Sequence, residues 1–299
     1  MQAGIYLVHK PVGPSSGSLV EQFREDLRAA GIRPGKLPVC HGGALDPFAH
    51  GLLLLLAGPA TRLMELLHPI PKSYEAEIAW GAETDNGDLL GRVVREGDAS
   101  VLTPPALDDA LREFLGWRDQ VPPAHSNKRV GGERAYEKAR RGEEFVLPSS
   151  RVYLHEARFL SHDLPRRSRL LLTCRGGYYV RALARDMGRA SGCGAHLSAL
   201  HRTAIGPWED PPPGQRVLVQ GESLLPWCAS RELDTREVNA VLAHRPIARG
   251  ELRAPTWKLP PGFPDPDAPV RGLQDGKLLA LMRMEGAMLR PGVVMGRGI

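Results

Sequence analysis

The chain has 299 residues, enough for one large and one small domain, and its 42% hydrophobic and 24% charged composition is ordinary for a folded protein. Lysine and arginine exceed aspartate and glutamate by 39 to 34, which weakly favours a polyanionic partner. The four cysteines form no C-x-x-C pair, and the apolar run 51–58 is too short to span a bilayer. We therefore expect free thiols, no metal, no membrane association and a cytoplasmic location.

The hydrophobic pattern of the first 80 residues predicts both strands and helices. Residues 4–8 predict a buried strand, and apolar residues at helical spacing predict a helix over 18–30. The run 51–58 suits either a buried strand or a core helix segment. Residues 59–67 predict a helix, and the alternation over 74–80 predicts a strand.

The rest of the chain continues this mixture. Thr103 is suited to cap a helix that carries Pro104 and Pro105 in its first turn and runs to about residue 115. The other predicted elements are helices over 135–141, 180–190 and 235–242 and strands over 152–160, 169–174, 277–283 and 293–295. Because no regular βαβ repeat appears, we expect an α+β fold, with a domain boundary between about 210 and 235.

Asp46 is the first candidate for chemistry. In the sequence Gly43-Ala44-Leu45-Asp46-Pro47 the glycine allows a tight turn, and the proline restricts the backbone that follows Asp46. The carboxylate of Asp46 is therefore presented on a loop. An Asx turn is the commoner role for an aspartate in such a loop. His41 lies close by, and a lone histidine is more often structural than catalytic.

Arg181 and two tyrosines are further candidates. Arg181 begins the predicted helix 180–190 after a Gly-Gly-Tyr-Tyr sequence, and a guanidinium can hold a carboxylate through two parallel hydrogen bonds. An arginine on a solvated helix face is the commoner case. Tyr74 and Tyr179 could stack on a flipped base, although core packing is the commoner role of a single tyrosine.

A basic segment spans residues 126–141 and includes Tyr136. Such a run is usually only a solvated face. Cations interleaved with glycines and an aromatic ring nevertheless suit a segment that grips RNA. Its cations are Lys128, Arg129, Arg134, Lys138, Arg140 and Arg141.

Taken together and in this order, the motifs resemble those of the TruB family of pseudouridine synthases. The similarity covers roughly residues 3–210, which is far more than a single-motif coincidence. The matched motifs are K-P-x-G-x-S-S at 10–16, H-x-G-A-L-D-P at 41–47, K-x-Y at 72–74, Q-x-P-P at 120–123, G-x-Y-x-R at 177–181 and L-x-R at 200–202.

The resemblance implies a particular fold and division into domains. It implies a pseudouridine synthase fold with a central mixed, mainly antiparallel sheet flanked by helices. The catalytic domain would cover 1–230 and carry an RNA-clamping insertion at about 124–148. Residues 231–299 would form a small β-rich, RNA-binding domain of PUA-like type.

The resemblance also implies an activity, namely isomerisation of the uridine at position 55, in the T loop of tRNA, by base flipping and without a cofactor. Asp46 corresponds to the essential aspartate, Tyr74 to the tyrosine that stacks on the flipped base, and Arg181 to the arginine that pairs with the aspartate. The enzyme would act as a monomer. The implied substrate-binding residues are His41, Tyr179, Leu200, Lys10, Arg129, Arg134 and Arg202.

Four positions depart from the family pattern. His9 stands in place of an aspartate, Gly42 of a threonine, Leu90 of a polar residue and Arg129 of a lysine. None is a catalytic position, so the chemistry should survive, and the departures at Gly42, Leu90 and Arg129 bear on RNA affinity more than on activity. Two alternatives remain, namely a non-catalytic protein that binds or folds tRNA and a synthase for another RNA, free or within a guided ribonucleoprotein.

Overall fold

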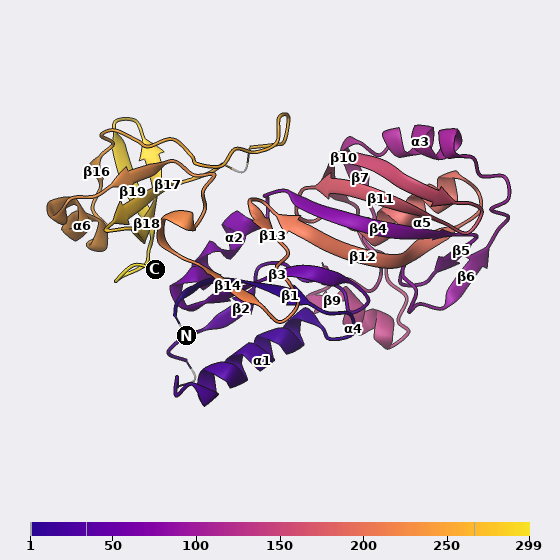
Figure 1. Ribbon diagram of the computed structural model, residues 1–299, viewed down its shortest axis with the longest axis horizontal. Coiled ribbons are helices and arrows are strands. Elements are labelled where there is room, and N and C mark those ends of the chain that lie inside the picture. The colour runs from indigo at the N-terminus through magenta and orange to yellow at the C-terminus, as the bar shows by residue number, and fades with distance from the viewer. Residues whose placement is uncertain (1, 34, 266) are drawn as a thin grey trace. The chain divides into compact units, whose positions relative to one another are not determined.

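The computed structural model describes residues 2–33, 35–265 and 267–299, and the chain forms two compact units. Unit 1 combines the N-terminal and C-terminal parts of the chain, and unit 2 consists mainly of its middle (Figure 1). Unit 1 comprises Met1–Pro47, Gly51–Ile70 and Ile205–Ile299, and unit 2 comprises Phe48–His50 and Pro71–Ala204.

The N-terminal sheet of unit 1 is antiparallel. Strand β1 (Gly4–Lys10) lies between β14 (Arg216–Val219) and β3 (His50–Ala57), and β3 also pairs with β2 (Val39–His41). Helix α1 (Ser16–Ala29) packs on one face of this sheet. Its apolar residues recur at helical spacing, so that Val20, Phe23 and Leu27 are buried against alternate residues of β1 and β3.

The apolar run 51–58 is a strand rather than a helix, because both faces of β3 are buried. Leu53 and Leu55 face the core under α1, whereas the even-numbered leucines face a second core. The predicted helix over 59–67 is only partly right. The chain instead forms a 3₁₀ helix, η1 (Gly58–Leu63), and a single α-turn, α2 (Met64–Leu67).

The C-terminal residues of unit 1 form a second sheet, in the order β15–β17–β18–β19–β16. Helix α6 (Thr235–Leu242) begins as predicted, with Asp234 and Glu237 forming a capping box. Leu273, Leu278 and Ile299 contribute to the same core as Ile5 and Leu7 of β1. The strands of this sheet are β15 (Ser230–Glu232), β16 (Ile247–Ala248), β17 (Val270–Gln274), β18 (Lys277–Glu285) and β19 (Met288–Val294).

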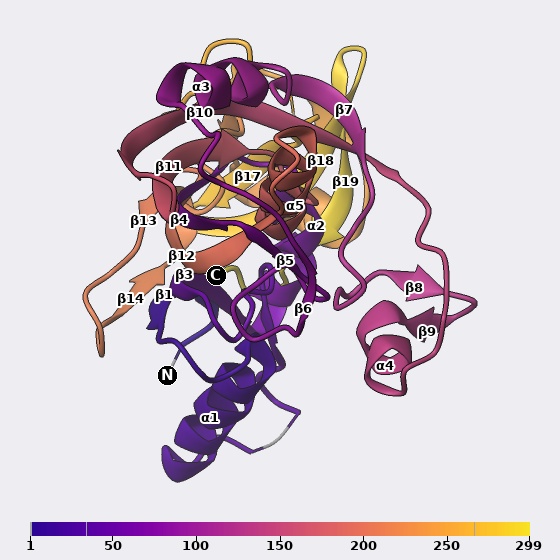
Figure 2. The same ribbon diagram turned by 90° about the vertical axis from the view of Figure 1, so that its right-hand side faces the viewer.

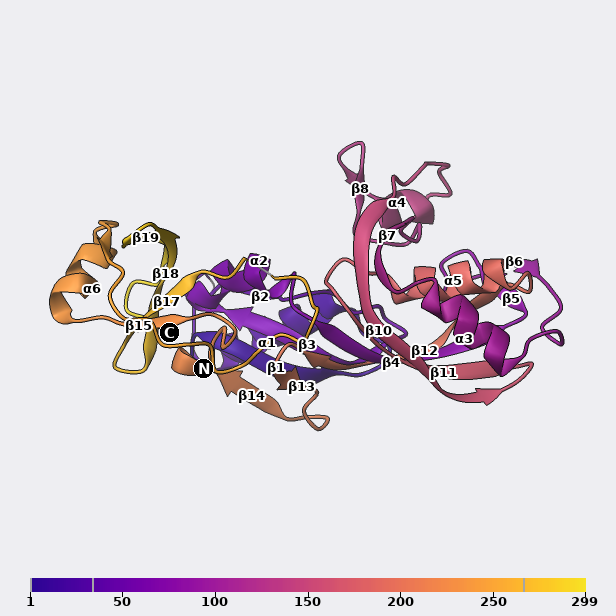
Figure 3. The ribbon, with the colours of Figure 1, turned by 90° about the horizontal axis from the view of Figure 1, so that it is seen from above.

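Unit 2 is built on a second run of strands, in the order β12–β4–β11–β10–β7, which Figure 3 shows from above. Helix α5 (Val180–Ala190) forms where a helix was predicted and packs through Leu183 and Met187, which are both fully buried. Helix α3 (Pro104–Arg112) lies against β10 and α5. The strands are β4 (Lys72–Trp80), β7 (Gly116–Gln120), β10 (Ser150–Asp163), β11 (Arg167–Cys174) and β12 (Ala195–Ile205).

Two small hairpins complete unit 2. One consists of β5 (Ala82–Thr84) and β6 (Val93–Glu96). The other consists of β8 (Arg129–Val130) and β9 (Glu133–Arg134), followed by helix α4 (Ala135–Arg140), and Figure 2 shows that this segment stands apart from the strands of the unit. Together with the larger sheets and the few helices, these hairpins confirm the predicted α+β class.

Several details test the sequence predictions further. Thr103 does occupy the N-cap of α3, but its side chain makes no capping hydrogen bond, and the helix ends at Arg112 rather than near 115. The pyrrolidine rings of the first turn stabilise the start of the helix instead, because they preset φ. All four cysteines are free. Among the described residues, no helix has the length and apolar content to cross a membrane.

Gly188 fixes how closely α5 approaches the start of β12. A Cβ atom at this position would lie 2.2 Å from the backbone nitrogen of Ala195. We expect Gly188→Ala to lower the free energy of unfolding by at least about 1–3 kcal/mol, because the backbone at Ala195 would have to shift. Gly17 in α1 is a matched control, since its nearest neighbour would be 3.7 Å away and Gly17→Ala should be neutral or stabilising. Urea denaturation of both variants checks this, and equal effects would contradict it.

Candidate active site

The loop that carries Asp46 is held on both sides by the N-terminal K-P-x-G-x-S-S motif. The buried hydroxyl of Ser16 accepts a hydrogen bond from the Leu45 backbone N–H (2.8 Å) and donates to the Leu45 carbonyl (3.1 Å). The N–H of Gly13 donates to the Pro47 carbonyl at 2.8 Å. These hydrogen bonds hold the residues on either side of Asp46, so the backbone position of this half-buried residue is fixed.

The glycines before Asp46 have separate roles. Gly43 adopts φ 128°, a conformation that side chains disfavour. Gly42 has a packing role, because a Cβ there would lie 3.0–3.1 Å from the side chains of Leu56 and Leu54. The departure from threonine at this position is thus matched by leucines that fill the space.

The other two unit 1 candidates lie on the strands next to this loop. Lys10 ends β1, is completely buried and donates from Nζ to the Pro11 carbonyl at 2.8 Å. His41 ends β2 and is half-buried. The other departure nearby, His9, has its Nδ1 2.8 Å from a carboxylate oxygen of Asp210, so this chain places the acid on a different segment.

Unit 2 supplies the aromatic and aliphatic candidates from neighbouring strands. Tyr74 lies on the buried face of β4 and is 7% exposed. Strand β12 pairs next to β4 and carries Leu200 and Arg202, which are 5% and 1% exposed. These three side chains are therefore buried on adjacent strands of one sheet.

Arg181 lies in the first turn of α5 and is 4% exposed. Its Nη1 donates to the Asn86 carbonyl at 2.6 Å and its Nη2 to the His125 carbonyl at 2.8 Å. These bonds orient the guanidinium plane, because they use donors on both terminal nitrogens. The orientation of Arg181 is thus set by two backbone carbonyls that the sequence motifs do not include.

The segment 120–125 is fastened to α5 at further points. Gln120 bonds Tyr179 through both ends of its amide, at 2.9 and 3.1 Å, and Arg185 donates to the Val121 carbonyl at 2.9 Å. Tyr179 itself is the half-buried N-cap of α5. Gln120 belongs to the Q-x-P-P motif, so the sequence did contain a signal for this contact.

The turn of the β5–β6 hairpin covers Arg181. A Cβ atom on Gly87 would lie 3.2 Å from the Cβ of Arg181, and Asp88 stabilises the turn by accepting from the Leu90 N–H at 2.9 Å. A cavity of about 260 Å³ opens beside Arg181 between this turn and residues 123–124. Leu90 is 65% exposed at the hairpin tip, where the family pattern predicted a polar residue.

Lys72 is a buried cation that lies two residues before Tyr74. Burial, followed by the charges of Arg202 and Arg175, lowers the pKa of Lys72 from 10.5 to about 7. Burial also raises the pKa of the neighbouring Cys174 thiol to about 12. Lys72 and Arg202 therefore lie close enough for their charges to interact inside unit 2.

The low pKa of Lys72 predicts that stability depends on pH. Between pH 7 and 10.5 the unfolded chain binds the Lys72 proton more tightly than the folded chain, so the free energy of unfolding rises with pH in this range. We expect Lys72→Met to reduce the gain between pH 7 and 9 by up to roughly 2.5 kcal/mol. Denaturant unfolding at pH 7 and at pH 9 measures this gain in the free energy of unfolding. Lys277→Met, at an exposed lysine, should leave the gain unchanged, and equal behaviour of the two variants would contradict the prediction.

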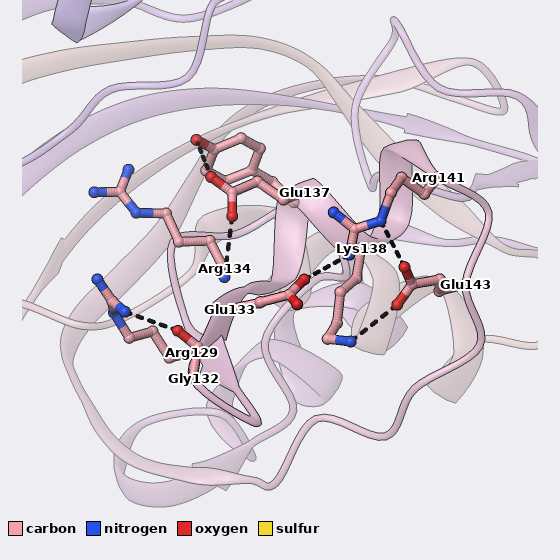
Figure 4. Close-up of polar contacts among 9 residues, drawn as sticks. Arg129, Gly132, Glu133, Arg134, Glu137, Lys138, Arg141 and Glu143 are labelled. Carbon is pink, nitrogen blue, oxygen red and sulfur yellow. Dashed lines mark hydrogen bonds and ion pairs between the residues drawn. The ribbon is translucent and has the colours of Figure 1, made fainter.

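The remaining candidates, Arg129 and Arg134, face each other across the β8–β9 hairpin and are both exposed (Figure 4). Arg129 Nη1 donates to the Gly132 carbonyl at 2.8 Å, and the guanidinium of Arg134 lies 6.0 Å from the ring centre of Tyr136. Among the described residues, no group of three or more His, Cys, Asp or Glu side chains gathers as metal ligands.

Comparison with solved structures shows that the chain shares its fold with proteins of known structure. A Cbf5–Nop10–Gar1 complex matches with a TM-score of 0.67 at 21% identity, over 98% of this chain and 85% of that chain. An H/ACA RNP bound to a substrate RNA containing 2′-deoxyuridine matches with a TM-score of 0.66 at 18% identity, over 98% and 84%. At these identities the likeness shows the fold alone.

Sequence comparison shows the family. The model of the TruB family pseudouridylate synthase N-terminal domain matches residues 34–180, and that of the tRNA pseudouridylate synthase B C-terminal domain matches residues 181–243. The chain belongs to the TruB family of pseudouridine synthases.

Individual relatives agree with this assignment. The chain is 36% identical to the tRNA pseudouridine synthase B of Cupriavidus metallidurans (strain ATCC 43123 / DSM 2839 / NBRC 102507 / CH34), over 96% of this chain and 92% of that protein. It is 42% identical to that of Xanthomonas campestris pv. campestris (strain B100) over 208 residues, which is 70% of this chain and 65% of the relative. The match to the Xanthomonas protein thus spans just under two thirds of its length.

Proposed function

We propose that this protein isomerises uridine to pseudouridine in the T loop of tRNA. The observation that carries the proposal is the Asp46 loop, which keeps the family's motif and is fixed by Ser16 and Gly13 immediately beside the aspartate. Relatives with high coverage are named tRNA pseudouridine synthase B, which supports tRNA as the substrate.

The reaction breaks the C1′–N1 bond, turns the uracil and forms a C1′–C5 bond, after which C5 loses a proton and N1 gains one. Atoms and electrons balance without an oxidant or reductant. A uridine inside a folded loop must first be extruded, at a cost of a few kcal/mol. Asp46 then either attacks the nucleotide covalently or abstracts a sugar proton to give a glycal, and both routes need its carboxylate ionised.

Tyr74 and Arg181 support Asp46 in this proposal. In the proposal Arg181 pairs with the carboxylate and keeps it charged. Its guanidinium is held by the carbonyls of Asn86 and His125. Tyr74 stacks on the flipped base, and Leu200 lines the pocket that receives it. The substrate-binding roles of His41, Tyr179, Lys10, Arg129, Arg134 and Arg202 belong to the same proposal.

RNA shape and phosphates provide most of the proposed recognition, with the T arm of tRNA as the bound element. The insertion at about 124–148 and the small C-terminal domain, residues 231–299, are the proposed RNA-binding parts, and the enzyme acts as a monomer.

A competition experiment tests the substrate. The protein is incubated with an unmodified tRNA transcript and an equimolar ribosomal RNA fragment, and pseudouridines are mapped by chemical derivatisation and primer extension. We expect modification at the T-loop uridine alone. Modification of the ribosomal fragment in preference to tRNA would contradict the proposed substrate but not the reaction.

A further inference from the structure

Five of the six cations of the insertion, all except Lys128, fall into two groups. Arg129, Arg134 and Arg140 are exposed, and none of them forms an ion pair within the described part of the chain. Lys138 and Arg141 instead bind carboxylates of the same segment (Figure 4). A basic run that the sequence presents as uniform is therefore divided by its own acidic residues.

The paired group is a four-membered network. Arg141 donates from Nη2 to Glu133 and from Nε to Glu143, both at 2.5 Å, and Lys138 Nζ donates to the other oxygen of Glu143 at 2.9 Å. Hydrogen bonds from Arg141 and then Lys138 lower the pKa of Glu143 to about 2, so it stays ionised at neutral pH. The network joins β9 to the residues that follow α4.

The carboxylates occupy the donors that a phosphate would use. An arginine fork binds carboxylate and phosphate with the same geometry, so Glu133 and Glu143 compete directly with an RNA backbone for Arg141. The other group differs, because Arg134 and Arg140 lie 6.0 and 5.5 Å from the ring centre of Tyr136, and neither forms an ion pair with a carboxylate among the residues that the structure describes.

We propose that Glu133 and Glu143 are specificity-determining residues that neutralise Lys138 and Arg141 and so limit the affinity of the insertion for non-cognate RNA. The proposal rests on RNA as the partner under the proposed function. Its physical basis is that every cation which neutralises a phosphate adds affinity regardless of sequence. Two neutralised cations leave more of the discrimination to the shape of the folded substrate.

The first test compares the double variant Glu133→Gln/Glu143→Gln with the wild type in binding to a uridine homopolymer of 20 nucleotides. Two released cations should steepen the slope of log K against log salt by about 1.4, since each single-strand phosphate contact adds about 0.7. Homopolymer affinity should rise roughly tenfold at 0.1 M salt. Affinity for folded tRNA should rise less, so discrimination falls.

Glu144→Gln is the matched control for net charge. Glu144 is exposed and forms no ion pair with any residue that the structure describes. Its removal changes net charge as either single glutamate variant does but releases no cation. If it steepens the salt slope as much as Glu143→Gln, or if neither variant changes the slope, the proposal is wrong.

A second test keeps net charge constant and guards against local unfolding. Arg141→Gln/Glu133→Gln removes a neutralised pair and should leave homopolymer affinity within twofold of the wild type. Arg140→Gln/Glu144→Gln removes an exposed cation together with an unpaired acid and should lower it about fivefold. Equal affinities of the two variants would overturn the proposal. Because every readout is binding, a wild type that fails to modify tRNA would refute the proposed function without deciding this test.

Discussion

Asp46→Asn is expected to abolish pseudouridine formation, with turnover lowered at least about 10⁴-fold, which is roughly 5.5 kcal/mol of activation free energy. The amide has the shape of the carboxylate but neither its charge nor its basicity. Because Gly13 and Ser16 hold the loop through the backbone and residues beside Asp46, the loop conformation should survive. Single-turnover assays on a tRNA transcript measure the loss.

The division between chemistry and binding is tested on the same variant. The affinity of Asp46→Asn for tRNA should stay within twofold of the wild type. Asp119→Asn, at an exposed carboxylate on β7, serves as the control and should keep full activity. A folded Asp46→Asn protein that still turns over, or one that no longer binds tRNA, would contradict the assignment.

Arg181→Lys is expected to lower turnover by about 10²–10³-fold, the usual effect of removing one preorganised charged donor. Lysine keeps the charge, but its single nitrogen cannot reproduce the fork through which two separate nitrogens of Arg181 bond the carbonyls of Asn86 and His125. Single-turnover rates at saturating enzyme separate this loss from any change in tRNA affinity.

Arg185→Lys is the control for this substitution, since Arg185 lies one turn further along α5 and bonds the Val121 carbonyl and Asp186. Its turnover should remain within about threefold of the wild type. Similar losses in both variants would show that the fastening of segment 120–125 to α5 matters, rather than a specific role of Arg181.

The sequence predicted the elements whose apolar residues follow a clear period. Helix α5 and strand β4 are of this kind, because each has one buried face and regular spacing. Strand β12 was missed. Its buried residues alternate from Ala195 to Leu197 and then change parity before Leu200, so no two-residue period extends along it. The strands β8, β9 and β16 have two residues each and are too short for any pattern.

The candidate site shows the same limit in another form. Motifs identified the side chains proposed for chemistry, such as Asp46 and Arg181. They could not show that Arg181 is oriented by the carbonyls of Asn86 and His125, because every residue carries a carbonyl and only the fold selects which ones a guanidinium meets. Nor could they show which cations of the insertion form ion pairs, since that depends on contacts such as Arg141 with Glu133.

The measurement that tests the central claim most directly is the release of tritium from C5-labelled uridine in an unmodified tRNA transcript, with wild type and Asp46→Asn compared. The account predicts release by the wild type only, and loss of release when the T-loop uridine is replaced. No release by a folded wild-type protein that binds tRNA would contradict the account and indicate a protein that binds tRNA without modifying it.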